Sequence, residues 1–205
     1  MPRLLELFSG TGSVGRAFAD LGWEVVSVDL DRNARPTICE NVLDWDWSTW
    51  PSGSFDVIWA SPPCQQYSCA RTRGPPPDLE SADRLVEKSL EIIDFFEPRW
   101  WWIENPATGL LHTRPCIQRM GAPYLVSYCR YGFLYRKNTH LWSNCPHLAP
   151  KVCRKDCAFF ENGRHPLSAQ RGPNKGQRRG QLSLSTLYRI PADLCADIAE
   201  ASSGE

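Results

Sequence analysis

Short apolar runs recur along the first 142 residues and are separated by turns or by segments with helical spacing. Each run has the length of a buried strand and ends in glycine, proline or acidic residues, which is typical of strands in an α/β sheet. The strands predicted in this way cover residues 4–8, 24–28, 37–42, 56–60, 100–103 and 137–144.

Two segments between these strands have the period of an amphipathic helix. The first covers 14–21, with Leu21 on its apolar face, and ends at Gly22. The second covers 85–96 and ends before Pro98. Because strands alternate with helices, the pattern predicts an α/β fold of the Rossmann-like type.

Charge and cysteine content narrow the class of protein. The chain has 23 Lys and Arg against 23 Asp and Glu, so it has no overall basic field, and any nucleic-acid-binding surface must be local. We find no secretory signal and no run long enough to cross a bilayer, which predicts a cytoplasmic protein without a membrane partner. We therefore expect the nine cysteines to be thiols, some of them catalytic or metal-binding.

A glycine-rich turn, F-S-G-T-G at 8–12, follows the first predicted strand. Its glycines let the backbone approach a ligand at the N-terminus of the next helix. Asp29 ends the second strand about 20 residues later, where a carboxylate can reach a ribose diol. The spacing differs from that of the dinucleotide motif, so a nucleoside without a pyrophosphate fits better.

A pair of prolines presents the strongest candidate nucleophile. The predicted strand 56–60 runs into Ser61, Pro62 and Pro63, which end the strand and place Cys64 in a loop. Two prolines restrict the backbone ahead of the thiol, which suits a nucleophile that must be aimed. Taken alone, Pro-Pro-Cys fits a turn with a structural cysteine equally well.

Two further strands end in polar residues. The strand 100–103 is followed by E-N-P at 104–106, and Asp44 follows the strand 37–42. Ligands bind outside the carboxyl ends of strands in open α/β sheets, so we expect these residues near the thiol. Asp44 could accept a hydrogen bond from an adenine amino group or could be a turn residue.

The order of these motifs resembles that of the cytosine carbon-5 DNA methyltransferases, which use S-adenosylmethionine to methylate a flipped cytosine. The turn at 8–12 resembles the cofactor motif of that family. P-C-Q-Q-Y-S at 63–68 matches its nucleophile motif, P-C-Q-x-x-S, and E-N at 104–105 matches its E-N motif. The resemblance implies a Rossmann-like S-adenosylmethionine-dependent methyltransferase fold.

The resemblance also implies residue roles. Cys64 would add to carbon 6 of cytosine, while Glu104 hydrogen-bonds or protonates ring nitrogen 3. Arg130 stands where the family carries a pair of arginines, and it could contact the base, a phosphate or only solvent. Cofactor contacts are implied for Phe8, Ser9, Gly10, Thr11, Gly12, Asp29, Leu30, Asp44 and Pro62. Substrate contacts are implied for Pro63, Gln65, Ser68 and Asn105.

The C-terminal third departs from the family. A last helix is predicted within 184–199, and no Gly-Asn-Ser motif returns to the cofactor. The segment before this helix contains residues that could form a tetrahedral zinc site and so fasten a loop-rich region, although free thiols and a surface histidine are the alternative. The predicted ligands are Cys145, Cys153, Cys157 and His165.

Two polar segments are expected to approach the substrate. The segment 71–78, rich in Arg, Gly and Pro, is predicted to be a lid over the target base. The stretch 170–181 is basic, rich in glycine and without apolar period, which favours contact with DNA phosphates over a solvated linker. Its basic residues are Arg171, Lys175, Arg178 and Arg179. So short a region predicts a brief recognition sequence.

The sequence thus predicts a catalytic domain at 1–142, a reduced target-recognition segment at 143–182 and a closing helix at 183–205. The expected protein is a compact monomer of phage, mobile-element or restriction-modification type that acts on duplex DNA. The alternatives are the same chemistry on RNA or a free cytosine nucleotide, methylation of an amino group, and an inactive DNA-binding relative.

Overall fold

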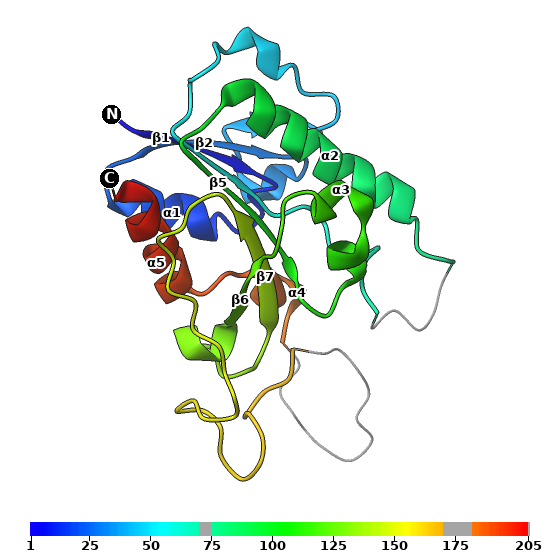
Figure 1. Ribbon diagram of the computed structural model, residues 1–205, viewed down its shortest axis with the longest axis vertical. Coiled ribbons are helices and arrows are strands. Elements are labelled where there is room, and N and C mark those ends of the chain that lie inside the picture. Colours follow the sequence, from blue (N-terminus) through cyan, green and yellow to red (C-terminus); the bar gives the residue numbers. More distant parts are fainter. Residues whose placement is uncertain (70–74, 170–181, 205) are drawn as a thin grey trace.

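A single mixed sheet runs through the computed structural model, which describes residues 1–69, 75–169 and 182–204 (Figure 1). Within these residues the strand order is β3-β2-β1-β4-β5-β7-β6. The first five strands pair in parallel, whereas β7 is antiparallel to both β5 and β6. The strands are β1 (Arg3–Leu7), β2 (Glu24–Asp29), β3 (Ile38–Cys39), β4 (Val57–Ala60), β5 (Trp100–Pro106), β6 (Tyr124–Ser127) and β7 (Asn138–Ser143).

Helices connect and flank these strands. The α-helices are α1 (Ser13–Asp20), α2 (Leu79–Phe96), α3 (Pro115–Gln118), α4 (Leu184–Tyr188) and α5 (Ala192–Ser203). Four short 3₁₀ helices are η1 (Arg32–Ala34), η2 (Trp47–Thr49), η3 (Leu110–Thr113) and η4 (Tyr128–Tyr131). None of the helices in the described ranges has both the length and the apolar character that crossing a membrane requires.

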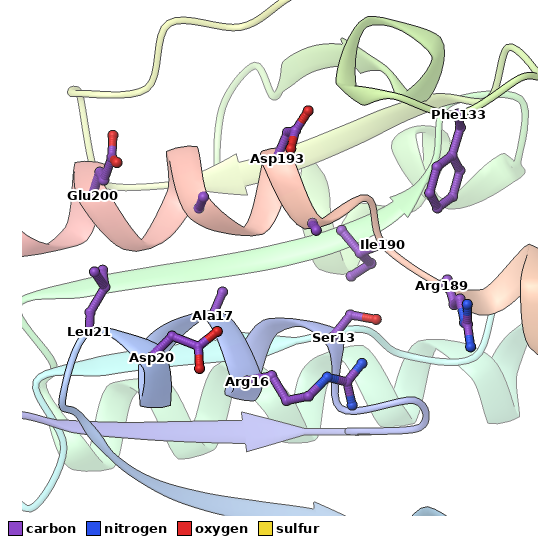
Figure 2. A pocket seen from close by; sticks show the side chains of 12 residues that line it. Ser13, Arg16, Ala17, Asp20, Leu21, Phe133, Arg189, Ile190, Asp193 and Glu200 are labelled. Carbon is purple, nitrogen blue, oxygen red and sulfur yellow. The ribbon is translucent and has the colours of Figure 1, made fainter.

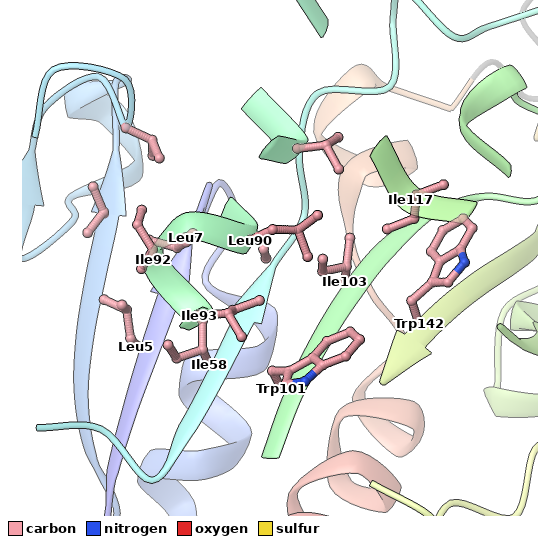
Figure 3. Close-up of a cluster of buried hydrophobic side chains, with 14 of the residues drawn as sticks. Leu5, Leu7, Ile58, Leu90, Ile92, Ile93, Trp101, Ile103, Ile117 and Trp142 are labelled. Atoms are coloured by element: carbon pink, nitrogen blue, oxygen red, sulfur yellow. The ribbon is translucent and has the colours of Figure 1, made fainter. Parts of the chain in front are cut away.

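Different helices cover the two faces of the sheet, because successive side chains of a strand point to opposite faces. Leu5, Leu7 and Ile58 pack in the cluster under α2 and α3 (Figure 3). Leu4 and Val57, next to them along the strands, pack in the cluster under α1 and α5. Parallel strands buried on both faces are mostly apolar, as the sequence predicted for this sheet, and Glu6 of β1 is a buried exception.

The predicted helix at 184–199 is two helices. Pro191 cannot donate to a helix and disfavours helical backbone in the residue before it, so α4 ends at Tyr188 and α5 begins at Ala192. The buried indole of Trp102 then donates a hydrogen bond of 3.0 Å to Ser202, which ties α5 to the centre of the sheet.

Two other expectations were wrong in detail. The strand predicted at 37–42 is only Ile38–Cys39, because Asn41 forms a turn in which its side chain accepts from the backbone of Leu43. Leu21 is 51% exposed, since it follows α1 and does not lie on its buried face. The remaining predicted strands and the helix ending before Pro98 are confirmed, and β6 was not predicted.

A buried carboxyl group lies at the beginning of α1. The N-cap residue, Gly12, has no side chain to cap the helix. Glu6 of β1, which is 3% exposed, instead accepts from the backbone N–H groups of Val14 and Gly15. Burial outweighs these hydrogen bonds and raises the pKa of Glu6 from 4.5 to about 7.

We expect this carboxyl to make stability depend on pH. The folded protein holds the proton of Glu6 more tightly than the unfolded chain, so the free energy of unfolding falls as pH rises from 4.5 to about 7. The pKa shift corresponds to roughly 3 kcal/mol at most. Glu6→Gln removes this component, and urea unfolding at several pH values measures the difference between variant and wild type.

The control is Glu24→Gln, which changes a half-exposed glutamate paired with Arg3 on the same sheet. It should leave the pH dependence of the wild type unchanged. Parallel curves for Glu6→Gln and the wild type would contradict the assignment.

Candidate active site

A cavity of ≈ 350 Å³ lies where the strands end. Its walls include the turn after β1, Asp29 at the end of β2, the loop 61–65 after β4, and Glu104 on β5. Lys137, just before β7, completes this part of the wall. The three motifs that stand far apart in the sequence therefore meet in one cavity.

The glycine turn and Asp29 form one end of the cavity. Gly10 and Gly12 have φ angles of +48° and +61°, which other residues rarely adopt. The backbone N–H of Gly10 donates to one oxygen of Asp29 at 2.7 Å, and that of Asp31 donates to the other at 2.8 Å. The carboxylate thus joins the turn after β1 to the end of β2.

The two other predicted cofactor residues of this region lie elsewhere. Leu30 is 70% exposed and Asp44 is also exposed, and neither lines the cavity. Asp31, which the sequence did not single out, lines it instead.

The loop with Cys64 is held from two sides. The buried side chain of Asn105 donates to the backbone oxygen of Pro62 at 3.0 Å. Tyr67 donates its backbone N–H to the oxygen of Cys64 at 3.2 Å, and its hydroxyl donates to Asp83 at 2.9 Å. The thiol is therefore presented by a loop fixed to β5 and α2.

The charges around Cys64 act in opposite directions. Burial, followed by the negative charge of Glu104, raises the pKa of the thiol, whereas Lys137 lowers it. The resting state of Cys64 is thus the thiol, and Lys137 is the group that favours the reactive thiolate.

Glu104 is fully buried, which raises the pKa of its carboxyl group. Lys137 lowers that pKa from 4.0 Å, and the hydroxyl of Tyr128 donates to the same carboxyl oxygen at 3.2 Å. A carboxyl in such a place can keep its proton near neutral pH and donate a hydrogen bond to a ring nitrogen.

The described motifs belong to a known family. A sequence model of the C-5 cytosine-specific DNA methylases matches residues 2–119. The chain is also 33% identical to a protein of Frog virus 3 (isolate Goorha) named "Probable DNA (cytosine-5)-methyltransferase", over 97% of this chain and 99% of the relative. The chain belongs to the C-5 cytosine-specific DNA methylase family.

A solved structure has the same fold. It is named as a DNA modification methyltransferase encoded within a prophage of E. coli, and it superposes with a TM-score of 0.53 at 18% identity. The match covers 82% of our chain and 53% of the other, so this family member spans about half the length of that protein. The likeness supports the Rossmann-like methyltransferase fold.

Some predicted substrate residues line the cavity and others do not. Pro63 and Gln65 line it, and Gln65 donates to the hydroxyl of Tyr188 at 3.2 Å. Ser68 forms an isolated bridge with Gly109 outside the lining. The basic residues of 170–181 and part of the predicted lid, residues 71–74, lie outside the described residues.

Arg130 does not line the cavity with Cys64. Its guanidinium pairs with Asp156 and donates to the backbone oxygen of Val152 at 3.4 Å. The neighbouring loop thus supplies the acceptors of Arg130 in this structure, and a contact with the base or with a phosphate stays a prediction.

Besides Asp31, several residues of the lining were not predicted. Among them, Lys137, Tyr188 and Ile190 come from the C-terminal part of the chain. Tyr128, which contacts Glu104, was not predicted either. The stretch Tyr188 to Pro191, which lies within the segment 184–199 predicted as the last helix, could have indicated the return of the chain to this cavity. Lys137 and Tyr128 carried no local signal.

The cysteine cluster differs from the predicted one. The metal-ligating atoms of Cys129, Cys153, Cys157 and His165 all lie within 4.8 Å of one another. Cys145 is not among them, because it is buried under α5 and its thiol donates to the backbone oxygen of Ala201 at 3.5 Å. The structure thus replaces Cys145 with Cys129 in a possible metal site.

A second cavity, of ≈ 610 Å³, is lined by residues of α1 and α5 (Figure 2). Its rim is charged, with Arg16 and Asp20 on α1 and Asp193 and Glu200 on α5. Although it is larger, it lies beside helices and contains neither a thiol nor Glu104. The chemistry of the family motifs therefore belongs to the smaller cavity.

We expect Lys137→Met to make Cys64 less reactive. Without the ammonium group, the pKa of the thiol rises further, so alkylation of Cys64 by iodoacetamide begins at higher pH. Mass spectrometry of the Cys64 peptide measures the midpoint. Lys88→Met, on the far side of α2, is the control and should leave the midpoint in place. An unchanged midpoint in Lys137→Met would remove the lysine from this role.

Proposed function

We propose that the protein transfers a methyl group from S-adenosylmethionine to carbon 5 of a flipped cytosine in duplex DNA, through a covalent bond between Cys64 and carbon 6. The observation that carries this proposal is the meeting of Cys64, Glu104 and the glycine turn in one cavity. The family of the chain supports the choice of cytosine and of DNA. We propose a monomer as the acting unit, since one chain supplies all these groups.

The donor groups of the cavity fit S-adenosylmethionine. Glu6, Asp29, Asp31 and Glu104 surround it with carboxyl groups, while Lys137 is the cation in its lining. Even with Glu6 and Glu104 protonated, the carboxylates of Asp29 and Asp31 outnumber the ammonium group of Lys137. This excess disfavours a pyrophosphate and favours a nucleoside with a positive charge. Residues 8–11 and Asp29 would hold the cofactor, which supplies a methyl group activated by a sulfonium.

The chain's own groups account for the activation of cytosine. The thiol of Cys64 loses its proton and its sulfur bonds to carbon 6, so that the ring electrons move toward nitrogen 3. There the protonated carboxyl of Glu104 donates its proton and stabilises the enamine. Carbon 5 then becomes nucleophilic enough to take the methyl group. A base removes the proton from carbon 5, Glu104 regains its proton from nitrogen 3, and the thiolate leaves as the double bond re-forms.

Lys137, Tyr128 and Asn105 prepare these two groups. Lys137 favours the thiolate of Cys64 and contacts Glu104, and Tyr128 donates to the same carboxyl oxygen of Glu104. Asn105 holds the oxygen of Pro62 and so positions the nucleophile loop. These are positioning roles, because none of the three bonds to the base.

A trapping experiment tests the covalent step. The protein is incubated with S-adenosylmethionine and duplex DNA that contains 5-fluorocytosine. Carbon 5 then carries a fluorine, which a base cannot remove as it removes a proton, so a covalent adduct with Cys64 should accumulate. Cys64→Ser should abolish it, whereas Cys69→Ser, which changes an exposed cysteine nearby, should retain it. Adducts on RNA or on a free fluorinated nucleotide but not on DNA would contradict the assignment of DNA as the substrate. A full adduct in Cys64→Ser would contradict the assignment of Cys64 as the nucleophile.

The basic stretch provides a second test. Replacing Arg171, Lys175, Arg178 and Arg179 by Gln should weaken DNA binding and lower the slope of log K against log salt concentration by about one for each phosphate that the protein no longer neutralises. Fluorescence anisotropy across a salt series measures both. An unchanged slope would remove the stretch from the DNA interface. Arg32→Gln and Arg35→Gln, around η1, serve as the matched control.

A further inference from the structure

The side chains of three cysteines and one histidine converge at a place outside the lining of the Cys64 cavity. Cys129 comes from η4, while Cys153, Cys157 and His165 come from the loop between β7 and α4. His165 Nε2 lies 3.3 Å from the sulfur of Cys157 and 3.7 Å from that of Cys153. Ligands at about 2.1 to 2.3 Å from a tetrahedral zinc ion are separated by roughly 3.4 to 3.8 Å, so the distances fit.

The surroundings of this cluster also fit a metal. The loop from Asn144 to Ala169 contains neither helix nor strand. Cys145 and Leu148 near its start pack in the cluster under α1 and α5, whereas the remainder has only a cluster of the three cysteines with Phe159 and Phe160 against them. So small a cluster cannot hold a loop of this length in one conformation. The backbone N–H of Lys155 donates to the sulfur of Cys153 at 3.3 Å, as it would to a thiolate ligand.

We propose that Cys129, Cys153, Cys157 and His165 bind a structural zinc ion that fastens this loop to η4. Three thiolates and one imidazole in tetrahedral array are typical of zinc, and four protein ligands leave no position for a catalytic water. A disulfide between two of the three cysteines is the competing use of the same residues, and all nine cysteines are free in this structure.

The zinc site supports the active site through η4. Cys129 is the neighbour of Tyr128, whose hydroxyl donates to Glu104. Two further contacts join the loop to residues 127–130. The backbone N–H of Cys153 donates to the hydroxyl of Ser127 at 3.0 Å, and Asp156 pairs with Arg130. Removal of the metal frees this segment and displaces Tyr128 from Glu104. This second step rests on the function proposed above, whereas binding of the metal does not.

Metal analysis of the purified chain is the first test. Elemental mass spectrometry should find one zinc ion per chain in the wild type and in Cys64→Ser, so the result is independent of methyl transfer. Cys129→Ser should reduce the zinc content to below about a tenth. Cys145→Ser, the matched control, changes a buried cysteine eight residues from Cys153 and should retain the full content.

Two further preparations keep the test decisive if Cys129→Ser fails to fold. His165→Cys offers a fourth thiolate and should still bind zinc. The cobalt-substituted wild type should show the visible bands of tetrahedral thiolate coordination. Wild type without zinc, a disulfide between two of the ligands in mass spectra, or zinc absent from Cys145→Ser but retained by Cys129→Ser would overturn the proposal.

The link to Glu104 is tested by a cycle of two changes. Chelation of zinc and Tyr128→Phe should each slow formation of the 5-fluorocytosine adduct, and chelation should have a much smaller effect in Tyr128→Phe than in the wild type. Purely additive effects would confine the zinc ion to a local structural role. A wild-type protein that binds zinc but forms no adduct would instead contradict the proposed function.

Discussion

The parallel register of three central strands is the constraint on which this molecule depends. Leu7 of β1 pairs with Ala60 of β4, and Ala60 pairs with Ile103 of β5. The residues that follow these positions are therefore level with one another, which brings the glycine turn, the Cys64 loop and Glu104 to one edge. The strands are buried on both faces, so a slip of one residue would exchange the two cores and scatter the site.

Once the register is set, desolvation decides the chemistry. Burial raises the pKa values of both Cys64 and Glu104 and so favours the protonated form of each. In the proposed mechanism the carboxyl uses its proton to donate to a ring nitrogen, whereas the thiol must lose its own. Lys137 acts on both groups, and the antiparallel strand β7 is what brings it beside β5. The ammonium group of Lys137 thus limits how far burial can raise the pKa values of Cys64 and Glu104.

The C-terminal part of the chain is held to the rest of the protein by few contacts, which differ between α5 and the loop before α4. α5 returns to the sheet through an apolar face and the hydrogen bond from Trp102 to Ser202. The loop that precedes α4 has no comparable core. Convergence of Cys153, Cys157 and His165 on Cys129 connects that loop to η4 and, through Tyr128, to Glu104. The proposed zinc site and the Cys64 cavity are therefore connected through one short segment of the chain.

The sequence by itself determined the elements whose signals are local. The apolar runs, the glycine turn, the prolines before Cys64 and the E-N pair after a strand are read within a few residues, and with the parallel sheet they predict most of the cavity. Only the tertiary structure decided which side chains from other segments join them. Lys137 and Cys129 have no neighbours in sequence that reveal their roles. Cys145 was predicted as a metal ligand, but it is buried under α5 and lies outside the cysteine cluster. The physical reason is that such contacts depend on packing between distant segments, which periodicity within one segment does not encode.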